Sequence, residues 1–143
     1  MNRRFFVLCA LVLASACGSD SGTGPNPTVT SVVGTWKLTS IDGKPLPWVY
    51  QAGDPTLESP KLELIAKQYV ITSAGTYTSS YTLRGTEFDG TVNTTTSNDA
   101  GTYTLTGNTV QFTSTTDASV TFGEATTTTI TIGGAVTQVF TKQ

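Results

Sequence analysis

Histidine is absent from this 143-residue chain, cysteine occurs only twice, and charged residues make up only 13% of the sequence. Without histidine, the chain lacks the commonest general base and the commonest nitrogen ligand of metals. Pairs of carboxylates could in principle cleave glycosidic bonds, but no pair is distinguished by its spacing. The sequence therefore predicts no catalytic residue, no metal site and no cofactor, and we expect a protein that is not an enzyme.

Long apolar runs are also missing, since the stretch from Phe5 to Leu13 is too short for the roughly 20 residues of a membrane-spanning helix. Two arginines precede this stretch, and small residues follow it up to Cys17, as in a secretory signal peptide. The ending Leu13-Ala14-Ser15-Ala16-Cys17 resembles the lipobox of bacterial lipoproteins. This resemblance implies that residues 1–16 are a signal peptide and that Cys17 is the lipid attachment site.

A lipidated Cys17 would make the membrane the predicted partner of this protein, because two or more acyl chains give stable anchoring. Gly18 stands where an aspartate would suggest retention at the inner membrane. The resemblance thus favours the bacterial cell envelope, and the outer membrane if the cell is Gram-negative. Ordinary signal cleavage that leaves a free thiol is the alternative.

Removal of the leader would also remove Cys9 and two arginines, which leaves a single cysteine and no possible internal disulfide. The remaining six Lys and Arg against ten Asp and Glu give a formal net charge of −4. An acidic domain is a poor partner for nucleic acid. Residues 17–31 are rich in Gly, Ser, Thr and Pro and predict a flexible tether, with a first strand as the alternative.

From Val32 onward the pattern is that of β-strands, in short alternating runs divided by Gly, Asn and Asp. Residues 34–41 alternate, with Trp36 and Leu38 on one face. Gly107-Asn108 predicts a two-residue hairpin turn. Counting back from that turn pairs residue 105 with 110 and residue 103 with 112, which places Leu105, Val110, Tyr103 and Phe112 on one face.

A second hairpin is predicted between residues 126–132 and 136–141, through a three-residue loop that sets Ile132 opposite Val136. Further strands are expected within residues 61–84, with breaks near Ala66-Lys67 and at Ala74-Gly75, within residues 87–94, and around Val120 and Phe122. The total of eight to ten short antiparallel strands in residues 32–143 indicates an all-β domain. A closed barrel or, as the runner-up, a sandwich would bury the single apolar face.

Gly34-Thr35-Trp36 resembles the Gly-x-Trp motif of lipocalins, and the stretches 34–47 and 101–108 are similar to bacterial lipocalin-like lipoprotein domains. The resemblance implies an up-and-down barrel whose closed end is plugged by Trp36, with Lys142 as the basic residue that covers it. The chain departs from the family in lacking a Thr-Asp-x-x-Tyr motif and a cysteine pair.

The one long irregular stretch, residues 42–60, contains four prolines but also Trp48 and Tyr50. Long loops with aromatic residues often form lids over binding sites. Trp48 and Tyr50 are therefore candidate contacts for an apolar or sugar-like ligand, and the alternative is that they fold over the barrel end as extra core. The leading hypothesis is non-catalytic binding of a small apolar molecule inside the barrel. The alternative hypothesis is a structural or protein-interaction module of the cell envelope, whose barrel is filled by its own side chains.

Overall fold

The computed structural model describes residues 28–54 and 56–143. The predicted signal peptide, the lipid attachment at Cys17 and the predicted tether up to residue 27 lie outside the described residues. The described part of the chain contains no helix and consists of ten strands. These strands are β1 (Gly34–Ile41), β2 (Lys44–Pro45), β3 (Trp48–Gln51), β4 (Lys61–Ile71), β5 (Thr76–Thr86), β6 (Val92–Thr106), β7 (Thr109–Ser114), β8 (Val120–Ala125), β9 (Thr129–Ile132) and β10 (Gln138–Lys142).

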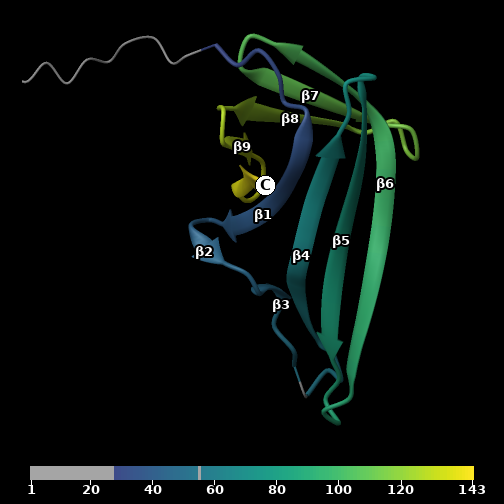
Figure 1. Cartoon of the computed structure of the whole chain (residues 1–143). Helices are drawn as coiled ribbons and strands as arrows, with labels where there is room; N and C mark the ends of the chain where they lie inside the picture. Colours follow the sequence, from purple (N-terminus) through teal and green to yellow (C-terminus); the bar gives the residue numbers. More distant parts are fainter. Residues whose placement is uncertain (1–27, 55) are drawn as a thin grey trace, which may run out of the picture.

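Eight of these strands form a closed antiparallel barrel (Figure 1). Strands β4 to β10 pair in sequence order, and β1 closes the ring because it pairs with both β4 and β10. Every pairing is antiparallel, so the barrel has the up-and-down order expected from the sequence and is consistent with a lipocalin-like fold. The sandwich alternative is excluded by this closure.

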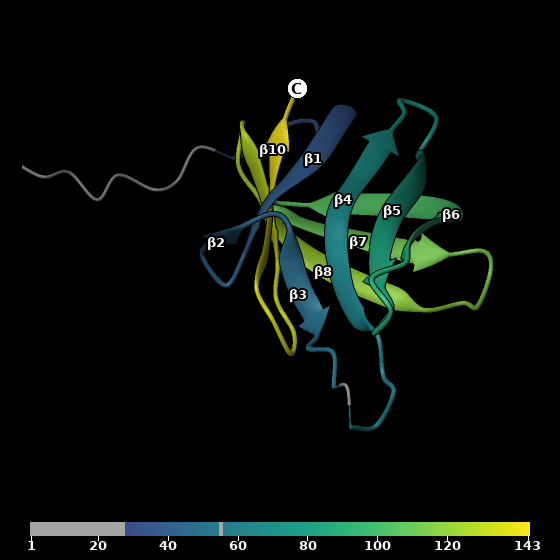
Figure 2. The ribbon, with the colours of Figure 1, turned by 90° about the horizontal axis from the view of Figure 1, so that it is seen from below.

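The ring is incomplete at one end, where β1 and β4 separate. These strands pair only from Gly34 to Lys37 of β1. Beyond that point β2 takes the free edge of β1, and β3 takes the free edge of the first half of β4. In Figure 2, which shows the molecule from below, the segment after β3 extends away from the barrel strands. The inserted strands cover the two free edges, which would otherwise leave unpaired backbone groups.

The hairpin of β6 and β7 has the predicted register, with Tyr103 opposite Phe112 and Leu105 opposite Val110. The register predicted for β9 and β10 is wrong, because Ile132 lies opposite Gln138 and not opposite Val136. The loop between β9 and β10 is longer than predicted because Asp42, the residue after β1, binds Thr137 within it. Asp42 donates its backbone N–H to the Thr137 carbonyl at 2.8 Å, and its carboxylate accepts from the Thr137 N–H at 2.7 Å.

Two further expectations need correction. Residues 87–91 form a turn and not the start of a strand, since the Glu87 N–H donates to the Thr91 carbonyl at 2.8 Å and Asp89 accepts from the Thr91 N–H. The predicted break near Ala66 is no interruption of β4. It is a bulge, seen as a register shift between Leu64 and Ala66 in the pairing of β4 with β5.

The core lies at the end of the barrel where β1 begins, and it is filled by inward-facing side chains. Tyr69 is stacked on Phe112 with ring centroids 4.7 Å apart, and Tyr77 and Phe140 pack edge-on against this pair. The segment before β1 adds Val29 and Val32, both buried. The Val29 N–H donates to Asn108 Oδ1 at 2.9 Å, in the turn between β6 and β7.

The packed body therefore begins by Val29, within the range predicted as tether, although residues 28–33 form no strand. This segment lies at the same end as the turns after β4, β6 and β8, and we call that end the closed end. The opposite side, where the turn after β1 meets the loop after β9 through Asp42 and Thr137, is called the open end.

Candidate functional site

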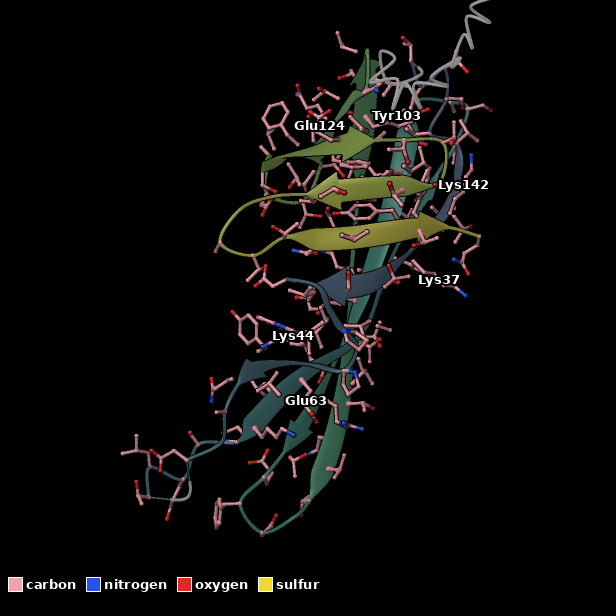
Figure 3. All side chains as sticks on the ribbon, turned by 90° about the vertical axis from the view of Figure 1, so that its left-hand side faces the viewer. Lys37, Lys44, Glu63, Tyr103, Glu124 and Lys142 are labelled. Carbon is pink, nitrogen blue, oxygen red and sulfur yellow. The ribbon has the colours of Figure 1, made fainter. Side chains whose placement is uncertain are left out.

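At the closed end, Trp36 and Lys142 lie directly opposite each other on β1 and β10. Trp36 is fully buried, and its indole N–H donates to the Val32 carbonyl at 2.7 Å. The Lys142 ammonium lies over the indole, with Nζ 5.3 Å from the ring centroid, and Figure 3 shows Lys142 at the end of β10. A Cβ on Gly34, whose φ is +138°, would approach Lys142 Cε to 2.9 Å, so glycine leaves room for the lysine. At the closed end the Lys142 side chain thus covers the buried ring of Trp36.

The open end carries a cleft of about 450 Å³, a size in the usual range of small-molecule pockets. Its walls come from β1, β3, β4, β5, β10 and the loop before β10. Eight of its ten lining residues are apolar or aromatic, and the other two are a lysine and a glutamine. The lining consists of Ile41, Trp48, Tyr50, Leu64, Lys67, Tyr81, Leu83, Ala135, Val136 and Gln138.

Trp48 and Tyr50, the two aromatic residues singled out in the sequence, both line this cleft. Their rings meet edge-on with centroids 6.3 Å apart. Trp48 is half-buried and packs against the core, whereas Tyr50 leaves 67% of its surface exposed. Trp48 thus forms part of the wall, and Tyr50 lies at the rim with its ring largely exposed.

Lys67 lies between the cleft and the packed core. It is not among the site residues predicted from the sequence. Its ammonium donates to Gln138 Oε1 at 2.9 Å and lies 5.8 and 5.7 Å from the ring centroids of Tyr69 and Phe140. Burial lowers the pKa of Lys67 from its ordinary value.

The sequence does contain a signal for this position. The apolar residues Leu62 and Leu64 have even numbers, whereas Tyr69 and Ile71 have odd ones, and such a switch within one strand requires a bulge. Beyond the bulge, Lys67 shares the inner face with Tyr69.

A second polar side chain with several partners is that of Asp99 on β6, which is partly buried. Its carboxylate accepts hydrogen bonds from the hydroxyls of Tyr77, Ser114 and Thr116 at 2.9, 2.7 and 3.0 Å. Burial acts to raise the pKa of Asp99, but these hydrogen bonds outweigh it and the pKa is lowered. The network joins β5 and β6 to the last residue of β7 and to the segment after it.

Glu63 on β4, labelled in Figure 3, is a buried carboxylate and does not line the cleft. Lys61 and Arg84 contact it at 2.8 and 2.7 Å, and their hydrogen bonds lower its pKa. This cluster joins β4 to β5 beyond the barrel. Both cations of this cluster are paired with Glu63, and none of the three residues lines the cleft.

Two other hollows have similar volumes of about 450 and 440 Å³, but hydroxyl and amide side chains such as Gln68 and Ser80 take a larger share of their lining. Within residues 28–54 and 56–143, no group of acidic or cysteine side chains could hold a metal ion. No helix in that part of the chain has the length and apolar character needed to cross a bilayer. Comparison with protein-family models, curated proteins and solved structures finds no match.

Proposed function

We propose that this protein is a lipid-anchored lipoprotein of the bacterial cell envelope that binds a small, mainly apolar molecule, without catalysis, in the cleft at the open end. The observation that supports this proposal best is the cleft itself, because it combines a volume of about 450 Å³ with an almost entirely apolar wall. Each CH₂ group that a ligand buries there would contribute about 0.8 kcal/mol.

The filled core supports a ligand site at the open end over one in the middle of the barrel. Phe112 and Phe140 occupy the interior next to Trp36, and all three are almost fully buried. A ligand would therefore lie above this core, between β3, β5 and the loop before β10.

The position of the chain's entry into the barrel is compatible with anchoring. Val29 is held at the closed end, and the eleven Cα–Cα steps from Cys17 to Thr28 reach at most about 40 Å. A lipid on Cys17, the site proposed from the lipobox resemblance, would attach the bilayer to the end opposite the cleft. The cleft would then stay open to the aqueous side.

Binding can be tested with N-phenyl-1-naphthylamine, an uncharged apolar dye whose emission rises in apolar surroundings, and with full chains carrying Cys17→Ser so that no lipid competes. We expect saturable binding that Trp48→Ala weakens about tenfold, because the substitution removes the largest of the three aromatic side chains in the lining. Phe122→Ala is the matched control, since Phe122 is 56% exposed on β8 away from the cleft. Absence of saturable binding, or equal loss in both variants, would contradict the proposal.

Anchoring is tested separately by mass spectrometry of the mature protein from cells. The proposal predicts an N-terminal Cys17 that carries a diacylglyceryl group, and an unmodified terminus would refute it.

The packed interior is the observation that favours the second candidate, a structural or protein-interaction module with a filled barrel. That function predicts no dye uptake and the recovery of protein partners from solubilised membranes.

A further inference from the structure

We infer that the ligand of the cleft is an amphipathic acid, with an apolar chain along the wall and a single carboxylate at the ammonium of Lys67. This inference rests on the proposed binding function and names the chemical class of the ligand.

The floor of the cleft presents one positive charge and no negative one. Lys67 is the only charged residue in the lining. Both ion pairs found among the described residues join Glu63 to Lys61 and Arg84, so neither involves Lys67. A charge that is partly removed from water and has no counterion costs free energy, and an anionic ligand group would offset this cost.

The hydrogen-bonding capacity at this point is also unfilled. An ammonium has three N–H donors, and within the described part of the chain Lys67 donates to a single acceptor, Gln138 Oε1. The same contact leaves the amide nitrogen of Gln138 with no acceptor among the described residues, although it belongs to the same lining. Two neighbouring donors match the two oxygens of a carboxylate.

The rest of the lining determines what the remainder of the ligand must be. The residues above Lys67 are Leu64, Leu83, Val136 and the aromatic rings of β3 and β5. They offer contact area but few polar groups, so a long apolar chain would find more partners there than the many hydroxyls of a sugar. The aromatic rings of Tyr69 and Phe140 close the floor on the core side and prevent deeper entry.

The inference is tested by displacing N-phenyl-1-naphthylamine from the chain with Cys17→Ser by three ligands of equal chain length: decanoate, decanol and decyltrimethylammonium. We expect decanoate to bind about tenfold more tightly than decanol, which corresponds to the low end of a hydrogen bond to a charged group. We expect decyltrimethylammonium to bind most weakly.

Lys67→Met should abolish the preference for decanoate while decanol still binds, whereas Lys67→Arg should keep the preference. Lys44→Met is the matched control, because Lys44 is an exposed lysine on β2 outside the lining, and it should change nothing.

Equal affinity for decanoate and decanol in the unsubstituted cleft, or a preference that survives Lys67→Met, would overturn the inference but leave apolar binding intact. Failure of all three ligands and of the dye would instead refute the binding function. The comparison of the three ligands decides the question even if Lys67→Met does not fold.

Discussion

Gly101 on β6 provides a sharp test of the packing, because its neighbours leave no room for a side chain. It lies opposite Tyr77 on β5 and Ser114 on β7. A Cβ added there would overlap the carbonyl oxygen of Thr113 and come within 2.8 Å of Tyr77 Cε1. The carbonyl belongs to the backbone and cannot rotate away, so β6 and β7 would have to separate.

We therefore expect Gly101→Ala to lower the free energy of unfolding by about 3 kcal/mol, the upper end for overpacking. The gain of about 0.5–1 kcal/mol that alanine brings to a strand interior would offset only part of this loss. The measurement is urea unfolding followed by circular dichroism, on the chain with Cys17→Ser.

Gly85→Ala is the matched control, since Gly85 also lies within a paired strand but its Cβ would meet Leu62 Cδ2 at an ordinary 3.5 Å. The control should be neutral or slightly stabilising. Equal urea midpoints for the two variants would show that the contacts around residue 101 do not limit the packing and would refute the reasoning.

Two further predictions concern the core and the closed end. Burial, and then the charge of Asp99, raise the pKa of Tyr69 from 10.0 to about 12. Because the unfolded chain loses this proton at lower pH than the folded chain does, about 3 kcal/mol of the free energy of unfolding should be lost as the pH rises from 10 to 12. Tyr69→Phe should remove this loss from urea unfolding measured at both pH values, and an unchanged pH dependence would contradict the assignment. Lys142→Met should lower the free energy of unfolding by about 1 kcal/mol, because it removes the cation over the Trp36 ring. Lys44→Met, the control at an exposed lysine, should leave the free energy of unfolding unchanged. Equal values for both variants would mean that the contact between Lys142 and Trp36 does not stabilise the barrel.

The strands that the sequence predicts best are those whose turn chemistry is local. Gly107-Asn108 joins β6 and β7 through two residues, and the alternation on both sides then leaves one register that buries Val110 and Phe112. The alternation in β1 likewise places Trp36 and Leu38 inside, as the buried and exposed residues of that strand show.

The register of β9 and β10 could not be predicted in this way, because it depends on Asp42, a residue ninety-five positions from its partner Thr137. The predicted and observed registers differ by two residues, and a shift of two keeps every side chain on its face. Ile130, Ile132 and Phe140 therefore remain buried even though their partners were misassigned. A hydrophobic pattern determines the face of a strand more firmly than it determines the neighbour.

The cleft arises from two irregularities that a strictly alternating pattern cannot describe. A register shift between Leu38 and Ser40 allows Ile41 to lie on the inner face together with Leu38, although their numbers differ in parity. The bulge between Leu64 and Ala66 has the same consequence in β4, where Leu64 and Lys67 both line the cleft. Without the second bulge, Lys67 would lie on the face of Glu63, where a lysine would be solvated or paired. The bulge in β4 thus places Leu64 in the wall of the cleft and Lys67 at its floor. The shape of the cleft and the acidic ligand proposed for it therefore depend on the same bulge.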